Sequence, residues 1–223
     1  GLGYVALGQN TTGSFNVGVG SNALNANTTG SSNTALGHAT LQAATTAGNN
    51  VAVGTSSQIL TTTGGSNVSV GTQAMRSNTT GQENVGIGYQ ALYTNATGVN
   101  NVAVGRRALY LNTASNNTAL GHQALYNTSS GADNTAVGLS ALVANTTGAN
   151  NVAIGRSALS SATTVNNNIA VGRYALQANT SGSPNLAIGG NALYTNTTGS
   201  YNVAIGHNTL NLSTTASKNT AVG

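Results

Sequence analysis

The stretch Asn202-Val203-Ala204-Ile205-Gly206 decides the fold, because variants of it recur along the whole chain. Earlier copies stand at 185–189, 168–172, 151–155, 101–105 and 16–20. The glycines that close the copies are 17 residues apart in twelve of thirteen intervals and 16 apart in the remaining one. A short fixed period over a whole chain is typical of a solenoid, in which each repeat forms one coil. The sequence therefore predicts an all-β fold, a parallel β-solenoid of about 13 coils that takes up residues 1–223 as one repeat segment.

Composition limits the classes of function that this chain can serve. Its 223 residues include six basic and two acidic ones, a net charge of +4, and no cysteine. A nucleic-acid-binding surface needs a dense basic stripe interleaved with aromatic side chains, which the chain lacks. The absence of cysteine excludes a disulfide scaffold, and no apolar run approaches the ~18 residues of a membrane span. Residues 1–3 are the tail of a repeat, Gly223 closes one, and neither end has a capping unit, so we expect a segment of a longer fibrous protein. From the composition we expect no nucleic-acid partner and no membrane insertion.

Alternate residues of a strand point to opposite faces of its sheet, so each repeat contributes to two kinds of column. The residues one and three before each closing glycine, such as Ile205 and Val203, are aliphatic or threonine, and we call them the aliphatic columns. The residue two before, such as Ala204, is Ala, Gly or Ser and forms the alanine column. We expect the aliphatic columns to face the core. We expect the alanine column to be covered at close range, either by the opposite wall of the coil or by a partner subunit.

A leucine column stands four residues after each closing glycine and includes Leu210. Met75 substitutes once, and the column lapses at Gln58, where we expect Ile59 and Leu60 to compensate through a local shift. Each coil thus brings about three sizeable aliphatic side chains inward, worth roughly 1.5–3 kcal/mol each. Ordering the backbone costs about 1–2 kcal/mol per residue, so a single chain of this composition is marginally stable. We therefore predict an oligomer.

The other repeated residues have turn or ladder chemistry. Gly206 and its copies supply a corner where the backbone can adopt positive φ. Asn202 and its copies suit an amide ladder, in which each side chain bonds to its copy one coil away. The recurrent Asn-Thr-Thr-Gly segment has the composition of a turn. The one-residue deletion falls in that segment, at 112–115, where a loop tolerates it best.

The repeated phrase N-[VT]-A-[VIL]-G-x-x-A resembles the head repeat of trimeric autotransporter adhesins of the YadA type. The longer phrase N-V-G-I-G-Y-Q-A-L-Y-T-N-A-T-G at 84–98 is similar to repeats of phage tail-fibre-like proteins. The resemblance covers the whole chain and implies a left-handed parallel β-roll that assembles as a homotrimer. The adhesin repeat is shorter, so 17 residues imply a wider coil or a bulged corner.

The function that this resemblance implies is that of a structural or adhesive shaft or head segment of an extracellular trimeric fibre. Such a fibre stands on a cell surface or a virion surface. Its implied partners are two further copies of itself and a host-cell or surface receptor, such as a glycan.

Large polar and aromatic side chains gather in two further columns. The post-glycine column, directly after each closing glycine, holds all three histidines, and the post-leucine column, directly after the leucine column, holds four tyrosines. These side chains could form outward stripes that stack on and hydrogen-bond sugars or a cell-surface polymer. Alternatively, the corners of a solenoid are simply where large polar groups fit. The ligand-contact candidates are Tyr89, Arg106, His122, Arg156, Arg173, His207, Tyr93, Tyr126 and Tyr194.

Neither metal binding nor catalysis is indicated. The histidines, His38, His122 and His207, stand five repeats apart, too far along the stack for two of one chain to share a zinc ion. The only acids, Glu83 and Asp133, stand in one column three coils apart, whereas a glycosidase needs two carboxylates about 5–9.5 Å apart. We therefore expect no metal, no cofactor and no enzymatic activity.

An ice-binding β-solenoid is the alternative function. Two threonine columns run down the turn segment, one starting at Thr11 and the other at Thr12. A flat, uncharged threonine ladder on a rigid solenoid is what an ice-matching surface needs. Against this alternative, adjacent residues of a strand cannot both face one plane.

Overall fold

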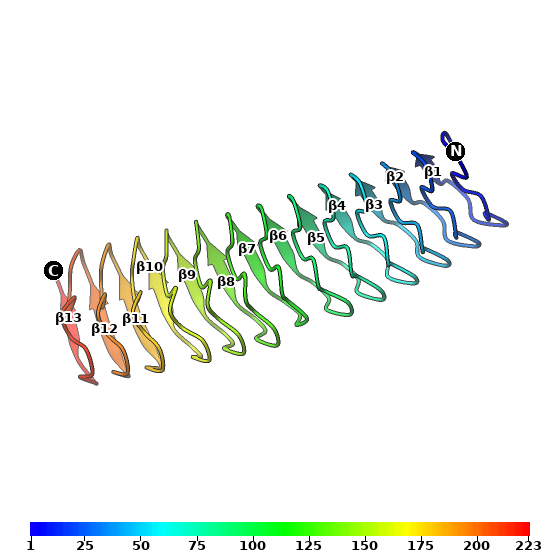
Figure 1. Cartoon of the computed structure of the whole chain (residues 1–223). Coiled ribbons are helices and arrows are strands. Elements are labelled where there is room, and N and C mark those ends of the chain that lie inside the picture. Colours follow the sequence, from blue (N-terminus) through cyan, green and yellow to red (C-terminus); the bar gives the residue numbers. More distant parts are fainter. The chain divides into compact units, whose positions relative to one another are not determined.

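A computed structural model describes residues 1–223 and confirms an all-β parallel solenoid with a repeat of 17 residues. Each coil contributes one short strand, and consecutive strands within a compact unit lie side by side (Figure 1). The chain divides into two compact units, Gly1–Ser115 and Asn116–Gly223. Both units have the same coil architecture.

Strands pair in parallel and in sequence order within each unit. The first unit contains β1 (Val17–Val19), β2 (Thr34–Leu36), β3 (Val51–Val53), β4 (Val68–Val70), β5 (Val85–Ile87) and β6 (Val102–Val104). The second contains β7 (Thr118–Leu120), β8 (Thr135–Val137), β9 (Val152–Ile154), β10 (Ile169–Val171), β11 (Asn185–Ile188), β12 (Asn202–Ile205) and β13 (Thr220–Val222). Equivalent positions lie opposite one another, as Asn185 does with Asn202. This register stacks every column of the repeat into a row.

The alanine column, and not the aliphatic columns, faces the interior of the coil. Ala187 and Ala204 are fully buried, whereas Val203 is half-buried and Ile205 is 36% exposed. The prediction that the aliphatic columns face the core is therefore wrong. Of the two covers predicted for the alanine column, the opposite wall of the same coil is the one found.

The leucine column supplies that opposite wall and explains why the inward strand position is small. Its members are fully buried in the middle of each unit, as Leu142 and Leu159 are, and Leu210 in the last coil is half-buried. A Cβ added to Gly18 would lie 3.2 Å from Cγ of Leu7, which stands across the same coil. The interior is thus one leucine deep, so the strand admits only Ala, Gly or Ser inward. Its aliphatic side chains consequently point outward.

Each coil bends at four positions with positive φ, except the coil in which Pro184 precedes the asparagine and only three remain. The corner glycines have φ between 120° and 146°, as predicted. Three further positions lie in the left-handed region: the second residue after the closing glycine, the leucine column, and the residue before the asparagine column. In one coil these are Ser140, Leu142 and Asn150, with φ of 54°, 53° and 59°. The sequence does not indicate these three positions, since most of their residues are neither glycine nor asparagine.

The predicted amide ladder at the asparagine column is confirmed. The side-chain Nδ2 and the backbone N–H of Asn151 both donate to Oδ1 of Asn134 in the preceding coil, each at 3.1 Å. The same Nδ2 donates to the carbonyl of Val165 at 2.7 Å. Each buried amide therefore joins two coils and satisfies a backbone carbonyl as well.

A second row of inward amides stands in the turn, seven residues after the closing glycine. Asn196 Nδ2 donates to Oδ1 of Asn179 at 3.1 Å and to the carbonyl of Gly199 at 3.0 Å. Ala162 interrupts the row, and Oδ1 of Asn145 in the preceding coil is buried without a partner. The row is thus a discontinuous ladder, since Oδ1 of Asn78 is also buried without a partner although Asn95 follows it.

The 16-residue interval falls in this turn, as predicted. Asn112 Nδ2 donates to the carbonyl of Ala114, two residues on, at 2.8 Å. In the preceding coil Asn95 Nδ2 donates to the carbonyl of Gly98, three residues on, at 3.0 Å. The turn is thus one residue shorter, and its asparagine side chain still donates a hydrogen bond to a backbone carbonyl of the same turn.

Gln58 occupies its leucine position without a shift, contrary to the prediction. Its φ is 48° and its side chain is fully buried, while Ile59 is half-buried and Leu60 is 42% exposed. Gln58 Nε2 donates to Oγ of Ser69 at 2.8 Å, and the hydroxyls of Ser57 and Ser69 are 2.6 Å apart. Polar pairing across the interior takes the place of apolar packing in this coil.

Candidate binding surface

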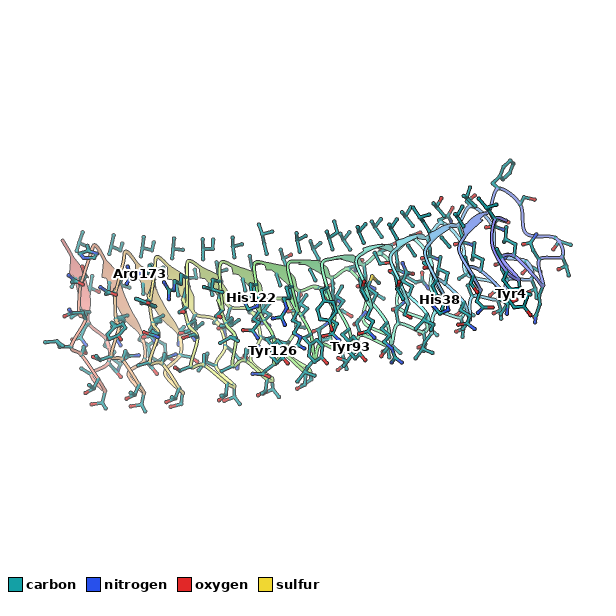
Figure 2. All side chains as sticks on the ribbon, turned by 45° about the horizontal axis from the view of Figure 1, so that its top comes forward. Tyr4, His38, Tyr93, His122, Tyr126 and Arg173 are labelled. Atoms are coloured by element: carbon teal, nitrogen blue, oxygen red, sulfur yellow. The ribbon has the colours of Figure 1, made fainter.

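The outward side of the strands is an apolar surface in each unit. We call it the outer face, and it consists of the two aliphatic columns, which contain no charged residue. Its most exposed members are Val17, Leu36, Val51, Val70, Ile87 and Val102 in the first unit, and Leu120, Ile154, Ile169, Ile188, Ile205 and Val222 in the second. Figure 2 shows branched side chains projecting outward from the strands. Monomeric soluble proteins rarely expose contiguous apolar patches larger than a few hundred Å², so the outer face is a candidate interface.

A hollow of about 310 Å³ adjoins the outer face of the second unit. Ile169, Leu186 and Val203 of one aliphatic column line it, and Pro184 and the 63% exposed Tyr201 stand beside them. The outer face therefore has a recess large enough to take a side chain of another molecule.

The nine ligand-contact candidates stand in columns away from the strands. Exposed among them are Tyr89, Arg106, Arg156, Arg173, His207 and Tyr194, and half-buried are His122, Tyr93 and Tyr126. Figure 2 labels four of them, Tyr93, His122, Tyr126 and Arg173. Their outward placement is as predicted, and their contact with a ligand stays a prediction.

Aromatic and cationic candidates of the first unit contact one another. The rings of Tyr93 and Tyr110 stack with centroids 5.0 Å apart and planes at 15°. The guanidinium of Arg76 lies 5.7 Å from the centroid of Tyr93, and that of Arg106 lies 5.9 Å from the centroid of Tyr89. Such stacked rings and cation–π pairs stabilise each other. The stack covers one face of Tyr93, whereas Tyr89 remains 42% exposed.

Two arginines and two tyrosines form a more open cluster in the second unit. The guanidinium groups of Arg173 and Arg156 lie 4.5 and 5.8 Å from the centroid of Tyr174. The ring of Tyr194 meets Tyr174 edge-on, with centroids 6.2 Å apart. Tyr174 was not among the candidates, because its column otherwise holds mainly small or amide side chains. Its place directly after Arg173 is the only signal in the sequence.

A second hollow, of about 420 Å³, adjoins this cluster. It is lined by Arg173, Tyr174, Asn191, Tyr194, Thr195, Asn211 and Leu212. Sequence reasoning named two of these residues, Arg173 and Tyr194, and missed the hollow, which depends on how residues of three coils come together.

In the threonine column that starts at Thr11, side-chain hydroxyls form hydrogen bonds to the next coil. Thr28 Oγ1 donates to the carbonyl of Thr45 at 3.0 Å, and Thr146 Oγ1 donates to the carbonyl of Thr163 at 2.9 Å. The column that starts at Thr12 is exposed. The ice-binding hypothesis is thus left with one threonine column whose hydroxyls face solvent.

Metal-ligating side chains do not gather in groups of three or more. The structure contains no helix with the length and hydropathy needed to cross a bilayer. The outer face and the arginine–tyrosine cluster are therefore the features on which a function can be argued.

Comparison with known proteins does not assign a family or a function to the chain. The resemblance of the repeats to adhesin heads and tail fibres rests on the motifs alone. No protein-family model, no curated protein and no solved structure matches the chain.

Proposed function

We propose that the chain is a structural and adhesive segment of an extracellular homotrimeric fibre, which projects from a cell or virion surface or attaches to one. The observation that carries the proposal is the outer face. Neither a cofactor nor a catalytic step has a part in this function.

The composition of the outer face favours burial. A solvated strand surface accepts Lys or Glu, and yet the aliphatic columns hold only Val, Ile, Leu and Thr. Burying such side chains is favourable by roughly 25 cal/mol per Å² of apolar area. Each strand presents two of them, so the gain accumulates with every coil.

A second copy of this chain is the partner that matches the outer face best. Its aliphatic columns have the same spacing from coil to coil, so side chains of two copies can interdigitate along the whole stack. Association through equivalent surfaces around a symmetry axis closes the assembly and leaves no outer face exposed. Three copies are what the resemblance of the repeats implies.

Attachment is the role of the columns away from the strands. They stay outward when the outer faces meet, and they contain the exposed arginines, histidines and tyrosines. A fibre of this kind separates the two tasks, because one side of the coil associates and the other sides meet solvent and receptor.

The test is the mass of the assembly, measured by native mass spectrometry or light scattering. We expect three copies for the wild-type chain. The double substitution Ile154→Lys with Ile188→Lys places two charges on the outer face, so we expect a monomer because a buried unpaired charge is strongly unfavourable.

The matched control is Thr147→Lys with Thr164→Lys, which adds the same charge to the exposed threonine column. It should keep the mass of three copies. A wild-type monomer, or dissociation of the control as complete as that of the outer-face variant, contradicts the proposal.

A further inference from the structure

We propose that the hollow beside Arg173 and Tyr194 binds an acidic glycan, a sugar chain that carries carboxylates. This inference rests on the proposed attachment function and names the ligand class and the site. The hollow has a volume of about 420 Å³, within the roughly 300–1,000 Å³ of small-molecule sites.

The cationic charge beside the hollow has no acidic protein partner. Arg173 lines the hollow, and both Arg173 and Arg156 lie against the ring of Tyr174. The one acid of the second unit, Asp133, stands in the column before the asparagines and forms no ion pair with either arginine. A ligand carboxylate would offset this charge, since a guanidinium binds a carboxylate through two parallel N–H donors.

An aromatic surface stands beside the charge. Tyr194 is 39% exposed and contacts another ring only edge-on, at Tyr174. In the next coil its column continues with Asn211 and not with a second tyrosine. Tyr93, by contrast, is stacked on Tyr110. The ring of Tyr194 is therefore available to the apolar face of a sugar.

Polar groups around the ring match sugar hydroxyls. Thr195 Oγ1 donates to the carbonyl of Asn211 at 2.8 Å, so its lone pairs can still accept. Asn191 Nδ2 donates to Oδ1 of Asn208 at 2.9 Å and keeps its own Oδ1 as an acceptor. The side-chain amide of Asn211 has both a donor and an acceptor to offer. The hollow thus offers hydrogen-bond partners for neutral sugar hydroxyls and a guanidinium for one carboxylate.

The same groups argue against a nucleic acid. Binding to single strands requires a positively charged groove that follows the backbone over several nucleotides. The second unit has only Arg156, Arg173 and Lys218 as permanent cations, and the first two converge on one ring. A single anionic group with neutral neighbours is the ligand that this arrangement fits.

The experiment is calorimetric titration of the full chain with a tetrasaccharide of alternating glucuronate and N-acetylglucosamine. The matched ligand is the same tetrasaccharide with its carboxylates reduced to alcohols. We expect the reduced sugar to bind at least about tenfold more weakly, because it loses the charge-assisted bonds to the guanidinium.

Substitutions assign the binding to this hollow. Arg173→Gln and Tyr194→Ala should each weaken binding of the acidic sugar by about tenfold or more. The control Tyr110→Ala removes an aromatic side chain from the same column, inside the stacked tyrosine pair of the first unit, and should leave the affinity within about twofold. All variants are checked for unchanged assembly mass.

Several results would overturn the site: no binding, equal binding of the reduced sugar, an equal effect of Tyr110→Ala, or tighter binding of a single-stranded oligonucleotide. If the chain forms trimers and yet binds no acidic sugar, the fibre proposal stands and the site is wrong. If the chain is a monomer and binds through Arg173, the site stands and the fibre proposal is wrong.

Discussion

At the residue scale, three polar side chains replace apolar ones at neighbouring positions of one coil interior. Gln58, Ser57 and Ser69 stand where other coils have Leu, Ala and Ala. Their mutual bonds satisfy Gln58 Nε2 and both hydroxyls, whereas Gln58 Oε1 is buried without a partner. A buried polar group that loses its partner retains its desolvation cost, so these residues depend on one another.

Removing one member of this group should therefore be worse than removing all of them. We expect Ser69→Ala to lower the free energy of unfolding by about 1–3 kcal/mol, since it removes the 2.8 Å bond of Gln58 Nε2 and leaves only a 3.4 Å bond to the carbonyl of Val51. The triple substitution Ser57→Ala, Gln58→Leu and Ser69→Ala restores the packing of the other coils and should equal or exceed the wild type. Denaturant unfolding measures both, and a triple variant less stable than Ser69→Ala contradicts this account.

Met75 and Gly86 are a second pair whose identities depend on each other. A Cβ on Gly86 would lie 2.8 Å from Cγ of Met75, across the same coil. Glycine in a strand costs roughly 0.5–1 kcal/mol relative to alanine, and here it makes room for the longer side chain.

We expect Gly86→Ala to stabilise the chain by at least about 0.5 kcal/mol more in a Met75→Leu background than in the wild type. A double-mutant cycle from denaturant unfolding gives this coupling directly. Additive effects of the two substitutions would show that Met75 moves aside without cost.

At the scale of the coil, backbone conformation selects the leucine column as strictly as packing does. Its members have φ near 50° and are Leu, Met or Gln, never Val or Ile. A β-branched residue is a genuine outlier at positive φ, because its Cβ substituents meet the backbone. The strands a few residues away, which have negative φ, are rich in Val and Ile.

Substitutions at Leu142 separate the two causes, since Met and Ile both approximate the volume of Leu. Leu142→Met should cost less than about 1.5 kcal/mol. Leu142→Ile should cost about 1–2 kcal/mol more than that, which is the penalty of the left-handed conformation. Equal losses in thermal or denaturant unfolding would mean that packing alone selects leucine.

Alternation along the strand and the spacing of the coils could be predicted from the sequence, but the inward direction could not. The prediction placed the more hydrophobic residues, such as Val203 and Ile205, inside, because burial usually follows hydrophobicity. In this coil the depth of the interior decides: leucines from the opposite wall fill it, so Ala204 is the residue that fits. The sequence of a single repeat does not show how deep the interior of the coil is.

The candidate site was predictable to a similar extent. The post-glycine and post-leucine columns follow from the period, and their members are outward, as Arg173 and Tyr194 show. Tyr174 was missed because its column lies at a left-handed position that the period does not reveal. Its contact with Arg173 is between neighbours in the chain, whereas its contact with Arg156 arises because adjacent coils stack. The spacing in the sequence does not show which ring meets which side chain of the next coil.

At the scale of the whole molecule, the narrow interior of the coils explains why apolar side chains lie outside. Narrow coils leave no room inside for the aliphatic columns, so each unit carries an apolar face outside. The leucine and alanine columns and the amide rows hold a coil together, and in the proposed fibre association of copies buries the aliphatic columns that the coil leaves outside. Stability should consequently depend on protein concentration, as it does for assemblies whose subunits are marginal alone.

The most direct test of this account is the rate at which a maleimide labels single cysteines, since the chain has no cysteine of its own. The positions are Ala153 in the interior, Ile154 on the outer face and Thr147 on the exposed threonine column, each replaced by cysteine. We expect the thiol at 153 to be protected throughout and the thiol at 147 to react fast. The thiol at 154 should be protected in the assembly and react fast when Ile188→Lys separates the copies. Fast labelling at 154 in the otherwise unaltered chain, at every protein concentration, would contradict the claim that copies of the chain cover the outer face.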